Sequence, residues 1–270
     1  MAETEIDRKN IFRIATWNCL QGKDKFPEKL KKIVEWAEAD IYVISECPKL
    51  DDDSDLLKNL NLQYAGWDGK EKGTAGVGIF IKYNHNVQKH PKGPENYDYH
   101  VLCTVNDKFH ILGIWAHAVD SKKNYAPCLL KYIKKHSEID CNYIITGDLN
   151  LDERVKGQNK QCKMDTKKIF EIFESAGLIS AYRKATGELH GSENKKTYYR
   201  SVYKRIEKPA RMVGENIHQP SCNILIPSSH IDYVFADERM IIDKSVKFGE
   251  PIEWLEYSDH LPLIVELKIK

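Results

Sequence analysis

The sequence predicts an α/β protein built as a four-layer α/β/β/α sandwich, in which two mixed, mostly antiparallel sheets are flanked by helices. Strand-like segments recur along all 270 residues, and only a few helix-like segments lie between them. A doubly wound parallel sheet would need a helix at nearly every crossover. No Pro/Gly/Ser-rich linker divides the chain, so we expect a single domain over residues 1–270, with residues 1–10 as a flexible leader.

The first half of the chain opens with a strand and an amphipathic helix. Ile11 to Trp17 is expected to be a strand, and Phe26 to Ala39 a helix, because Pro27 suits a first turn and apolar residues follow at helical spacing. Polar connections bearing Asn, Gly or Pro separate the next expected strands, which predicts a largely antiparallel middle. These strands are Ile41–Ser45, Val77–Lys82, Val101–Val105 and Phe109–Ala116.

The second half contains two expected helices. One includes Leu129, Leu130 and Ile133 and leads into a strand at Tyr143–Thr146, and the other runs to Ala176 and is closed by Gly177. The later strands are expected at Thr197–Tyr203, Ile231–Ala236 and Leu263–Ile269. We interpret the long connection from Ile206 to Ser229 as a wall of a substrate cleft.

The composition limits the class of protein. The net charge is only +1, so the molecule as a whole lacks the basic excess of a strong nonspecific nucleic-acid binder. A local exception runs from Lys195 to Arg211, where basic residues alternate with tyrosines. Such a stretch could contact phosphates and stack on bases, or it could be a solvated edge loop. Its members are Lys195, Lys196, Tyr198, Tyr199, Arg200, Tyr203, Lys204, Arg205, Lys208 and Arg211.

Cysteine usage and the N-terminal segment bear on location. The seven cysteines are spread along the chain without a CxxC pair, which predicts reduced thiols rather than a disulfide framework or a zinc site. The first ten residues are charged and include no apolar signal sequence, and no later apolar run is long enough to cross a bilayer. We therefore expect a cytoplasmic protein with no membrane attachment, and nothing in the sequence indicates an obligate protein partner.

Polar residues follow or precede several expected strands. Asn18, Glu46, His117 and Asp148 each lie just past the end of one, whereas Asp232 and the pair Asp259-His260 lie near the start of one. Antiparallel neighbours would bring both sets to the same edge of the fold. This layout predicts one assembled site rather than scattered surface charge.

The residue types indicate a divalent cation. Glu46 and Asp259 offer hard carboxylate oxygens, which suit Mg²⁺, or Mn²⁺, better than zinc. Asp148 and Asn150 are two residues apart, so in extended chain they face the same side and could share one substrate.

Two of the ten histidines are suited to phosphate contact and proton transfer. The imidazole of His260 needs a carboxylate to fix its tautomer, and His117 follows a strand in the same way as the other candidates. Asp232 is the natural partner for one of them.

These motifs together resemble the endonuclease/exonuclease/phosphatase superfamily, which has the deoxyribonuclease I-like fold. The resemblance covers Ile11 to Leu267 and rests on five motifs in order: Trp17-Asn18, Glu46, Gly147-Asp148-Leu149-Asn150, Ile231-Asp232-Tyr233 and Ser258-Asp259-His260.

The resemblance implies a role for each residue. Asn18, Glu46 and Asp259 would belong to the metal shell, and Asp148 and Asn150 would position the attacking water and the phosphate. His260, oriented by Asp232, would be the base or a transition-state contact. His117 matches the histidine that contacts the scissile phosphate. Whether Asp148 or His260 is the base stays open.

Departures from the pattern bear on the branch of the superfamily. Cys-Leu-Gln-Gly follows Asn18, Glu46 lies in Ser-Glu-Cys, and His117 stands where exonuclease III relatives tend to have Tyr. These features favour the branches that include deoxyribonuclease I, deadenylases, tyrosyl-DNA phosphodiesterases and sphingomyelinases. Thr197-Tyr198-Tyr199 resembles an element that lines the substrate cleft in nucleases, so Tyr198, Tyr199 and Arg200 are candidate substrate contacts; cross-strand aromatic packing is the other interpretation.

The sequence thus predicts a Mg²⁺-dependent phosphodiester hydrolase, a nuclease that acts on DNA by in-line attack of water. The enzymatic alternative is a phosphatase or phosphodiesterase for a small or lipid phosphate ester, such as an inositol phosphate or sphingomyelin. A binding module that kept the fold and lost catalysis is a third possibility.

Overall fold

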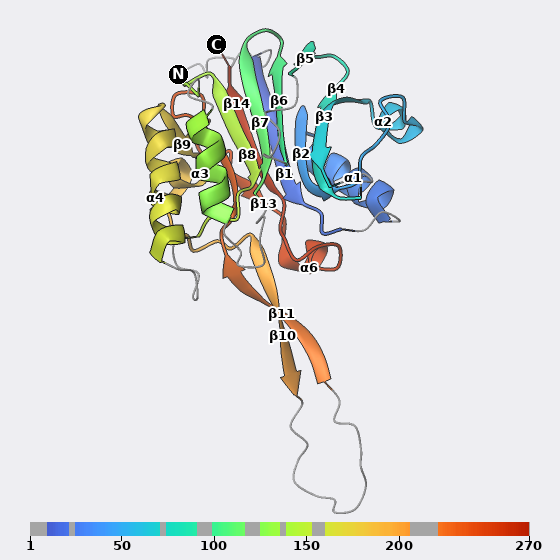
Figure 1. Ribbon diagram of the computed structural model, residues 1–270. Coiled ribbons are helices and arrows are strands. Elements are labelled where there is room, and N and C mark those ends of the chain that lie inside the picture. The colour runs from blue at the N-terminus through green and yellow to red at the C-terminus, as the bar shows by residue number, and fades with distance from the viewer. Residues whose placement is uncertain are drawn as a thin grey trace, which may run out of the picture.

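Two mixed sheets pack face to face at the centre of the molecule, with helices on both outer faces (Figure 1). The structure is a computed structural model that describes residues 10–21, 25–70, 74–90, 99–116, 125–135, 139–152, 160–205 and 221–269, with backbone alone at 203–205 and 221–223. His117 and the part of the basic stretch beyond Arg205, including Lys208 and Arg211, lie outside these ranges.

The first sheet has six strands in the order β13-β14-β1-β2-β4-β3. Only β1 and β2 run parallel to each other, and the remaining neighbours are antiparallel. The strand bounds in spatial order are Lys247–Phe248, Leu263–Lys268, Ile11–Asn18, Ile41–Cys47, Gly76–Lys82 and Leu62–Gly69.

The second sheet also has six strands, in the order β5-β6-β7-β8-β12-β9. Here β7 and β8 form the parallel pair. The bounds in spatial order are Val87–Lys89, His100–Val105, Phe109–Trp115, Tyr143–Asp148, Asp232–Asp237 and Leu178–Ser180. The two sheets therefore share one design, with a central parallel pair and antiparallel strands on either side, and the predicted fold class is confirmed.

Three apolar clusters hold the layers together. Ile14, Val43 and Ile79 of the first sheet meet Ile111 and Val234 of the second in the central cluster. Their neighbours along the strands point outward, because successive side chains of a strand face opposite sides. Each sheet thus buries both faces, one against the other sheet and one against helices.

The helices cover the outer faces. α1 packs Leu30 and Ile33 against the first sheet, and α3 and α4 pack residues such as Leu129 and Phe170 against the second. α1 begins with Pro27 in its first turn, as expected, and ends two residues earlier than expected, where Glu38 adopts a φ of 46°. The helices α1 to α6 are Phe26–Ala37, Asp55–Asn59, Tyr125–Lys135, Lys160–Ser175, Ala181–Thr186 and Pro251–Trp254.

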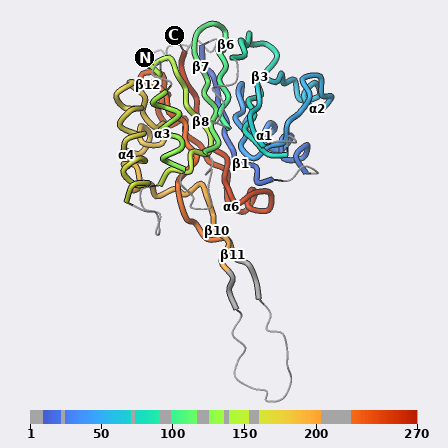
Figure 2. Tube along the Cα trace, in the orientation of Figure 1, coloured from blue at the N-terminus to red at the C-terminus, as the bar shows by residue number. Residues whose placement is uncertain are grey.

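A two-stranded ribbon projects from one end of the sandwich (Figure 2). Its strands are β10, Tyr198–Arg205, and β11, Ser221–Ser229. The prediction of a connection from Ile206 to Ser229 is wrong over residues 221–229, since β11 pairs with β10 along its length. The sequence pattern did not reveal β11 because Pro227 has no N–H to donate to the neighbouring strand and interrupts the alternation. A register shift at Tyr198/Tyr199 lies next to it.

The other elements that sequence patterns missed are short or irregular. β5, β9 and β13 have only two or three residues each, and α2, α5 and α6 have four to six, too few to show a period. β3 carries a register shift between Tyr64 and Gly66, which breaks its alternation. Among the described helices, none combines the length and apolar character needed to cross a membrane.

Candidate active site

The strand ends that carry the candidate residues meet at one end of the sandwich. Asn18 and Glu46 lie at the carboxyl ends of the parallel strands β1 and β2, and Asp148 lies at the carboxyl end of β8. Asp232 is directly opposite Asp148 in the antiparallel pair β12/β8. His260 comes from the segment before β14, which runs antiparallel to β1. Both sheets therefore contribute residues to one site through the ends of their central strands.

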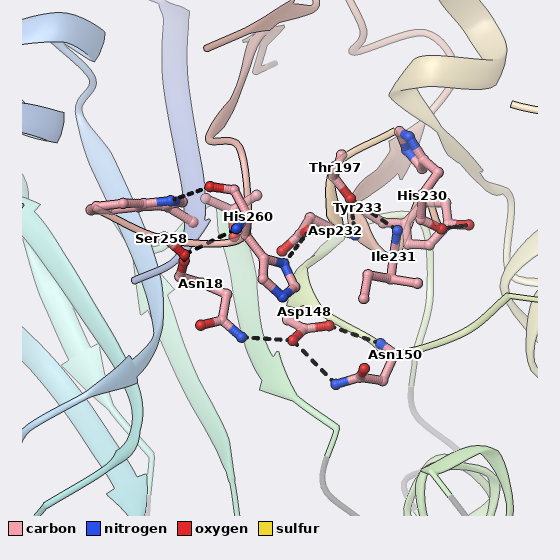
Figure 3. Close-up of polar contacts among 12 residues, drawn as sticks. Asn18, Asp148, Asn150, Thr197, His230, Ile231, Asp232, Tyr233, Ser258 and His260 are labelled. Carbon is pink, nitrogen blue, oxygen red and sulfur yellow. Dashed lines mark hydrogen bonds and ion pairs between the residues drawn. The ribbon is translucent and has the colours of Figure 1, made fainter. Parts of the chain in front are cut away.

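Asn18 bridges the two sheets. Its Nδ2 donates to Oε1 of Glu46 at 3.1 Å. The same nitrogen donates to Oδ2 of Asp148 at 2.9 Å, as Figure 3 shows. Its Oδ1 accepts the N–H of Leu20, and the N–H of Gln21 donates to Oε2 of Glu46 at 3.1 Å. Asn18 therefore fixes the distance between a carboxylate of the first sheet and one of the second.

An irregular backbone conformation at the end of β2 directs the Glu46 side chain toward the site. Glu46 lies at a register shift between β2 and β4 and has a φ of 59°, in the left-handed region that few non-glycine residues adopt. Such strain persists only where surrounding contacts enforce it, and it is frequent at functional sites. Its side chain remains half-buried, so the carboxylate reaches solvent.

The turn after β8 places Asp148 and Asn150. Gly147 has a φ of 134°, and a Cβ there would lie 1.9 Å from the carbonyl oxygen of Ile114, so only glycine fits next to β7. Asn150, with a φ of 50°, donates its N–H to Oδ1 of Asp148 and its Nδ2 to Oδ2. Nδ2 of Asn150 also donates to the carbonyl of Ala116. The Asp148 carboxylate is thus held by amide donors on both oxygens.

His260 lies between Asp232 and Asp148, as Figure 3 shows. Its Nδ1 is 2.8 Å from Oδ2 of Asp232, and since a carboxylate only accepts, Nδ1 carries a proton. The His260 backbone is fixed by Oγ of Ser258, which accepts its N–H, and by Nε1 of Trp17, which donates to its carbonyl. Burial lowers the pKa of His260, but the Asp232 carboxylate opposes this and the pKa is raised overall. The imidazole therefore holds its proton more tightly than usual.

The carboxylates crowd one another. Burial raises the pKa of Asp148, the charge of His260 lowers it, and the charge of Asp232 raises it further. Asp259 is half-buried, and its pKa is also raised, chiefly by burial, with the Glu46 carboxylate among the later causes. Four carboxylates therefore share this region with one imidazole, so the local charge is negative without a bound cation.

The geometry allows two cation positions. Ligand atoms of Asp148, Asp232 and His260 lie within 4.8 Å of one another. Nδ1 of His260 faces Asp232, so only Nε2 could bind a metal, and the raised pKa of His260 favours a proton on that nitrogen too. Glu46 and Asp259 are half-exposed hard-oxygen donors beside an uncompensated negative charge, and this donor set fits Mg²⁺ or Mn²⁺.

The candidate substrate residues on β10 do not all face the site. Tyr198 lies beside His260, with ring centroids 5.0 Å apart, and the carboxylate of Asp259 contributes, after burial, to raising its pKa. Tyr199, the next residue, faces the opposite way and packs in the cluster around α1. Arg200 returns to the face of Tyr198 and is exposed. Tyr198 therefore lies at the candidate site with Arg200 on the same face of β10, and Tyr199 is a core residue.

The structure adds residues that sequence patterns did not assign to the site. Lys29 of α1 is 5% exposed, and its Nζ donates to the carbonyls of Cys19 and Leu20, behind Glu46. Tyr125, at the start of α3, has its pKa raised by burial and then by Asp148. Ser258 and Thr197 belong to recognised motifs but had no assigned role. A lysine at an otherwise apolar position of α1 was the one signal that the sequence offered.

The comparisons with known proteins found matches to the fold but none to the sequence. No protein-family model matches the sequence, and no curated protein matches it. Solved structures do match. An AP endonuclease from Archaeoglobus fulgidus aligns with a TM-score of 0.63 and 17% identity over 94% of this chain and 98% of that one.

Two further structures extend the comparison. The 3' phosphatase NExo from Neisseria, bound to a product DNA hairpin, has a TM-score of 0.60 and 15% identity over 95% of this chain and 99% of its own. The human Nocturnin catalytic domain, with a bound sulfate anion, has a TM-score of 0.61 and 16% identity over 97% and 95%. This chain therefore shares the deoxyribonuclease I-like fold with these structures.

Proposed function

We propose that the protein is a Mg²⁺-dependent phosphodiester hydrolase, a nuclease that acts on DNA by in-line attack of water. The observation that carries the proposal is the Asn18 bridge, which holds Glu46 of one sheet and Asp148 of the other. It places half-exposed carboxylates beside a buried acid-base cluster. The fold likeness to an AP endonuclease and to NExo supports action on nucleic acid.

Glu46 and Asp259, with Asn18 beside them, are the residues that would hold the cation. A bound Mg²⁺ neutralises charge on the phosphate and polarises it for attack. The imidazole of His260 supplies an N–H donor at Nε2 for a phosphate oxygen next to that position, whereas the amide protons of Asn150 hold the Asp148 carboxylate and the Ala116 carbonyl. Nδ1 of His260 is held by Asp232, so the Nε2 donor needs no rearrangement when negative charge develops on the phosphate.

Asp148 and His260 have different roles in proton transfer. Asp148 accepts donors on both oxygens, and its raised pKa makes it a stronger base than an exposed carboxylate. His260, held by Asp232, carries its Nδ1 proton toward that carboxylate and presents Nε2 to the site. Asp148 as base and His260 as transition-state donor is the assignment that these pKa directions favour. The role of His117, a cytoplasmic location and the absence of a protein partner stay predictions of the sequence.

A substrate panel tests the proposal. Plasmid DNA, a single-stranded oligonucleotide, RNA, bis-p-nitrophenyl phosphate and inositol phosphates are each incubated with Mg²⁺, with EDTA as control. Cleavage of DNA and of the generic diester that stops in EDTA is expected. Turnover of inositol phosphates without cleavage of nucleic acid would support the small-ester alternative, and no turnover of any substrate would support a binding module.

A further inference from the structure

Thr197 is buried where three parts of the site meet. Its side chain has no exposed surface, and Oγ1 accepts the N–H of Ile231 at 3.0 Å and the N–H of Asp232 at 3.2 Å. Figure 3 shows the hydroxyl directed at the start of β12, next to the carboxylate that faces His260. A single hydroxyl thus holds the amide of Asp232 and the amide before it.

The sheet alone does not hold these amides. On one side β12 pairs with β8, with Asp232 opposite Asp148. On the other side β9 pairs with β12 only over Phe235–Asp237 and ends before it reaches Asp232. The Thr197 hydroxyl therefore takes the place of a missing strand, and buried amides without it would lack an acceptor.

The backbone of Thr197 extends the connection to His260. The N–H of Thr197 donates to the carbonyl of Ser229, at the end of β11, and its carbonyl accepts the N–H of Leu261, the residue after His260. The same residue thus holds the chain on the Asp232 side and on the His260 side. A change at Thr197 alters the position of one partner relative to the other.

Asp232 depends on its backbone for orientation. Oδ2 contacts Nδ1 of His260, whereas Oδ1, although buried, has no hydrogen-bond partner among the described residues. Asp148, by contrast, has amide donors on both oxygens. With a single side-chain bond, the direction of the Asp232 carboxylate is set by where its main chain lies.

We propose that Thr197 is a positioning residue for the hydrolytic reaction: its hydroxyl fixes the first amides of β12 and so aims Asp232 at Nδ1 of His260. This role rests on the proposed function of the site. Thr197 itself touches no reacting atom. Its effect on the reaction is through the geometry of the Asp232–His260 pair, where small displacements have large effects on rate.

A matched pair of variants tests the proposal. Thr197→Val keeps the branched shape and removes the hydroxyl, whereas Thr197→Ser keeps the hydroxyl and removes a methyl group. In Thr197→Val, hydrogen exchange at the amides of Ile231 and Asp232 should accelerate by about 10-fold or more, in line with loss of a buried acceptor. The downfield ¹H NMR signal of the His260 Nδ1 proton, assigned by its loss in Asp232→Asn, should shift upfield or broaden.

Steady-state kinetics and Mn²⁺ binding of the same variants distinguish an effect on the reaction from an effect on the cation site. With bis-p-nitrophenyl phosphate, kcat of Thr197→Val should fall by roughly 10- to 100-fold with KM little changed. The Kd for Mn²⁺ should stay within about 3-fold of the wild type, a difference of less than 1 kcal/mol, because Glu46 is held by Asn18 and Gln21 rather than by Thr197. Thr197→Ser should behave like the wild type in every measurement.

Each outcome decides the matter. A normal exchange rate and a normal His260 proton signal in Thr197→Val would overturn the proposal, as would a Thr197→Ser variant that is equally impaired. If Thr197→Val does not fold, Thr197→Cys replaces it, and its weaker acceptor should give intermediate values. If the wild type cleaves no diester, the proposed function fails, while exchange and NMR still report on Thr197.

Discussion

The two halves of the candidate site differ in their access to water. The metal half consists of Asn18, Glu46 and Asp259, and both of its carboxylates are half-exposed. The proton half consists of Asp148, Asp232 and His260, whose exposures are 1%, 0% and 5%. A hydrated cation must exchange ligands with solvent, whereas proton-handling groups work best where water does not compete. Under the proposed function, this difference in burial separates cation binding from proton transfer within one small site.

The largest expected effect lies in the proton half. Asp148→Asn and His260→Gln keep side-chain size and remove the proton acceptor and the imidazole. Each should lower kcat on bis-p-nitrophenyl phosphate by about 10³-fold or more, because each removes a group acting in the transition state. Circular dichroism should show the wild-type fold. Activity retained in either variant would exclude that residue from the mechanism.

The metal half should respond in a different way. Glu46→Gln keeps an acceptor oxygen for Asn18 but removes the charge, so the Kd for Mn²⁺ should rise by about 100-fold. High Mg²⁺ concentrations should recover part of the activity, which they should not do for Asp148→Asn. Isothermal titration and a Mg²⁺ dependence of kcat/KM measure both. An unchanged Kd would place the cation elsewhere.

Substitutions at Lys29 test which contacts hold the residues of the metal half in place. Its Nζ ties down the carbonyls of Cys19 and Leu20, in the same turn whose amides bind Asn18 and Glu46. Lys29→Met should loosen that turn and weaken Mn²⁺ binding by roughly 10-fold, the size typical for groups that support ligands. Lys29→Arg, which keeps the donors, should restore most of the affinity. Equal Kd values for Met and Arg variants would show that the donors are not needed.

The smallest effect concerns the support behind the proton half. His230 is buried, its Nδ1 lies 2.9 Å from the carbonyl of Lys195, and burial lowers its pKa. The unfolded chain then takes up this proton at higher pH than the folded one. The stability linked to His230 is therefore complete above about pH 6.5 and is lost as pH falls through the lower, folded pKa.

His230→Asn removes that dependence and keeps a donor for the Lys195 carbonyl. Below about pH 6.5 the free energy of unfolding of the wild type should fall more steeply than that of the variant, by up to about 1.4 kcal/mol per pH unit. Urea unfolding at a series of pH values compares the slopes. Parallel curves would mean that His230 titrates alike in both states.

The longer strands and helices could be predicted because their sequence patterns lie within a single segment of the chain. β1, β2 and β7 are predominantly apolar segments, and Pro27 and Gly177 mark helix ends. β11 was not, because Pro227 interrupts its pattern, and the short strands were not, because two or three residues leave no period to detect. The position of β9 also depends on β12, which follows more than 50 residues later in the chain.

The candidate residues of the site could be named from motifs, but their mutual geometry could not. Nothing in Trp17-Asn18 indicates that Asn18 bonds to Glu46 and Asp148 together. The opposite facing of Tyr198 and Tyr199 follows from strand alternation, yet which one meets the site depends on the pairing of Tyr198 with His260. Lys29 was absent from the predicted set because its partners are backbone carbonyls, which no motif records.

The most direct test of the account is the location of the cation. Crystals grown with Mn²⁺ and a non-hydrolysable phosphodiester analogue would locate the metal by anomalous scattering. The account predicts a peak shared by Glu46 and Asp259, with a phosphate oxygen beside it and His260 and Asn150 facing the same phosphorus. A peak enclosed by Asp148, Asp232 and His260, with none at Glu46, would contradict it.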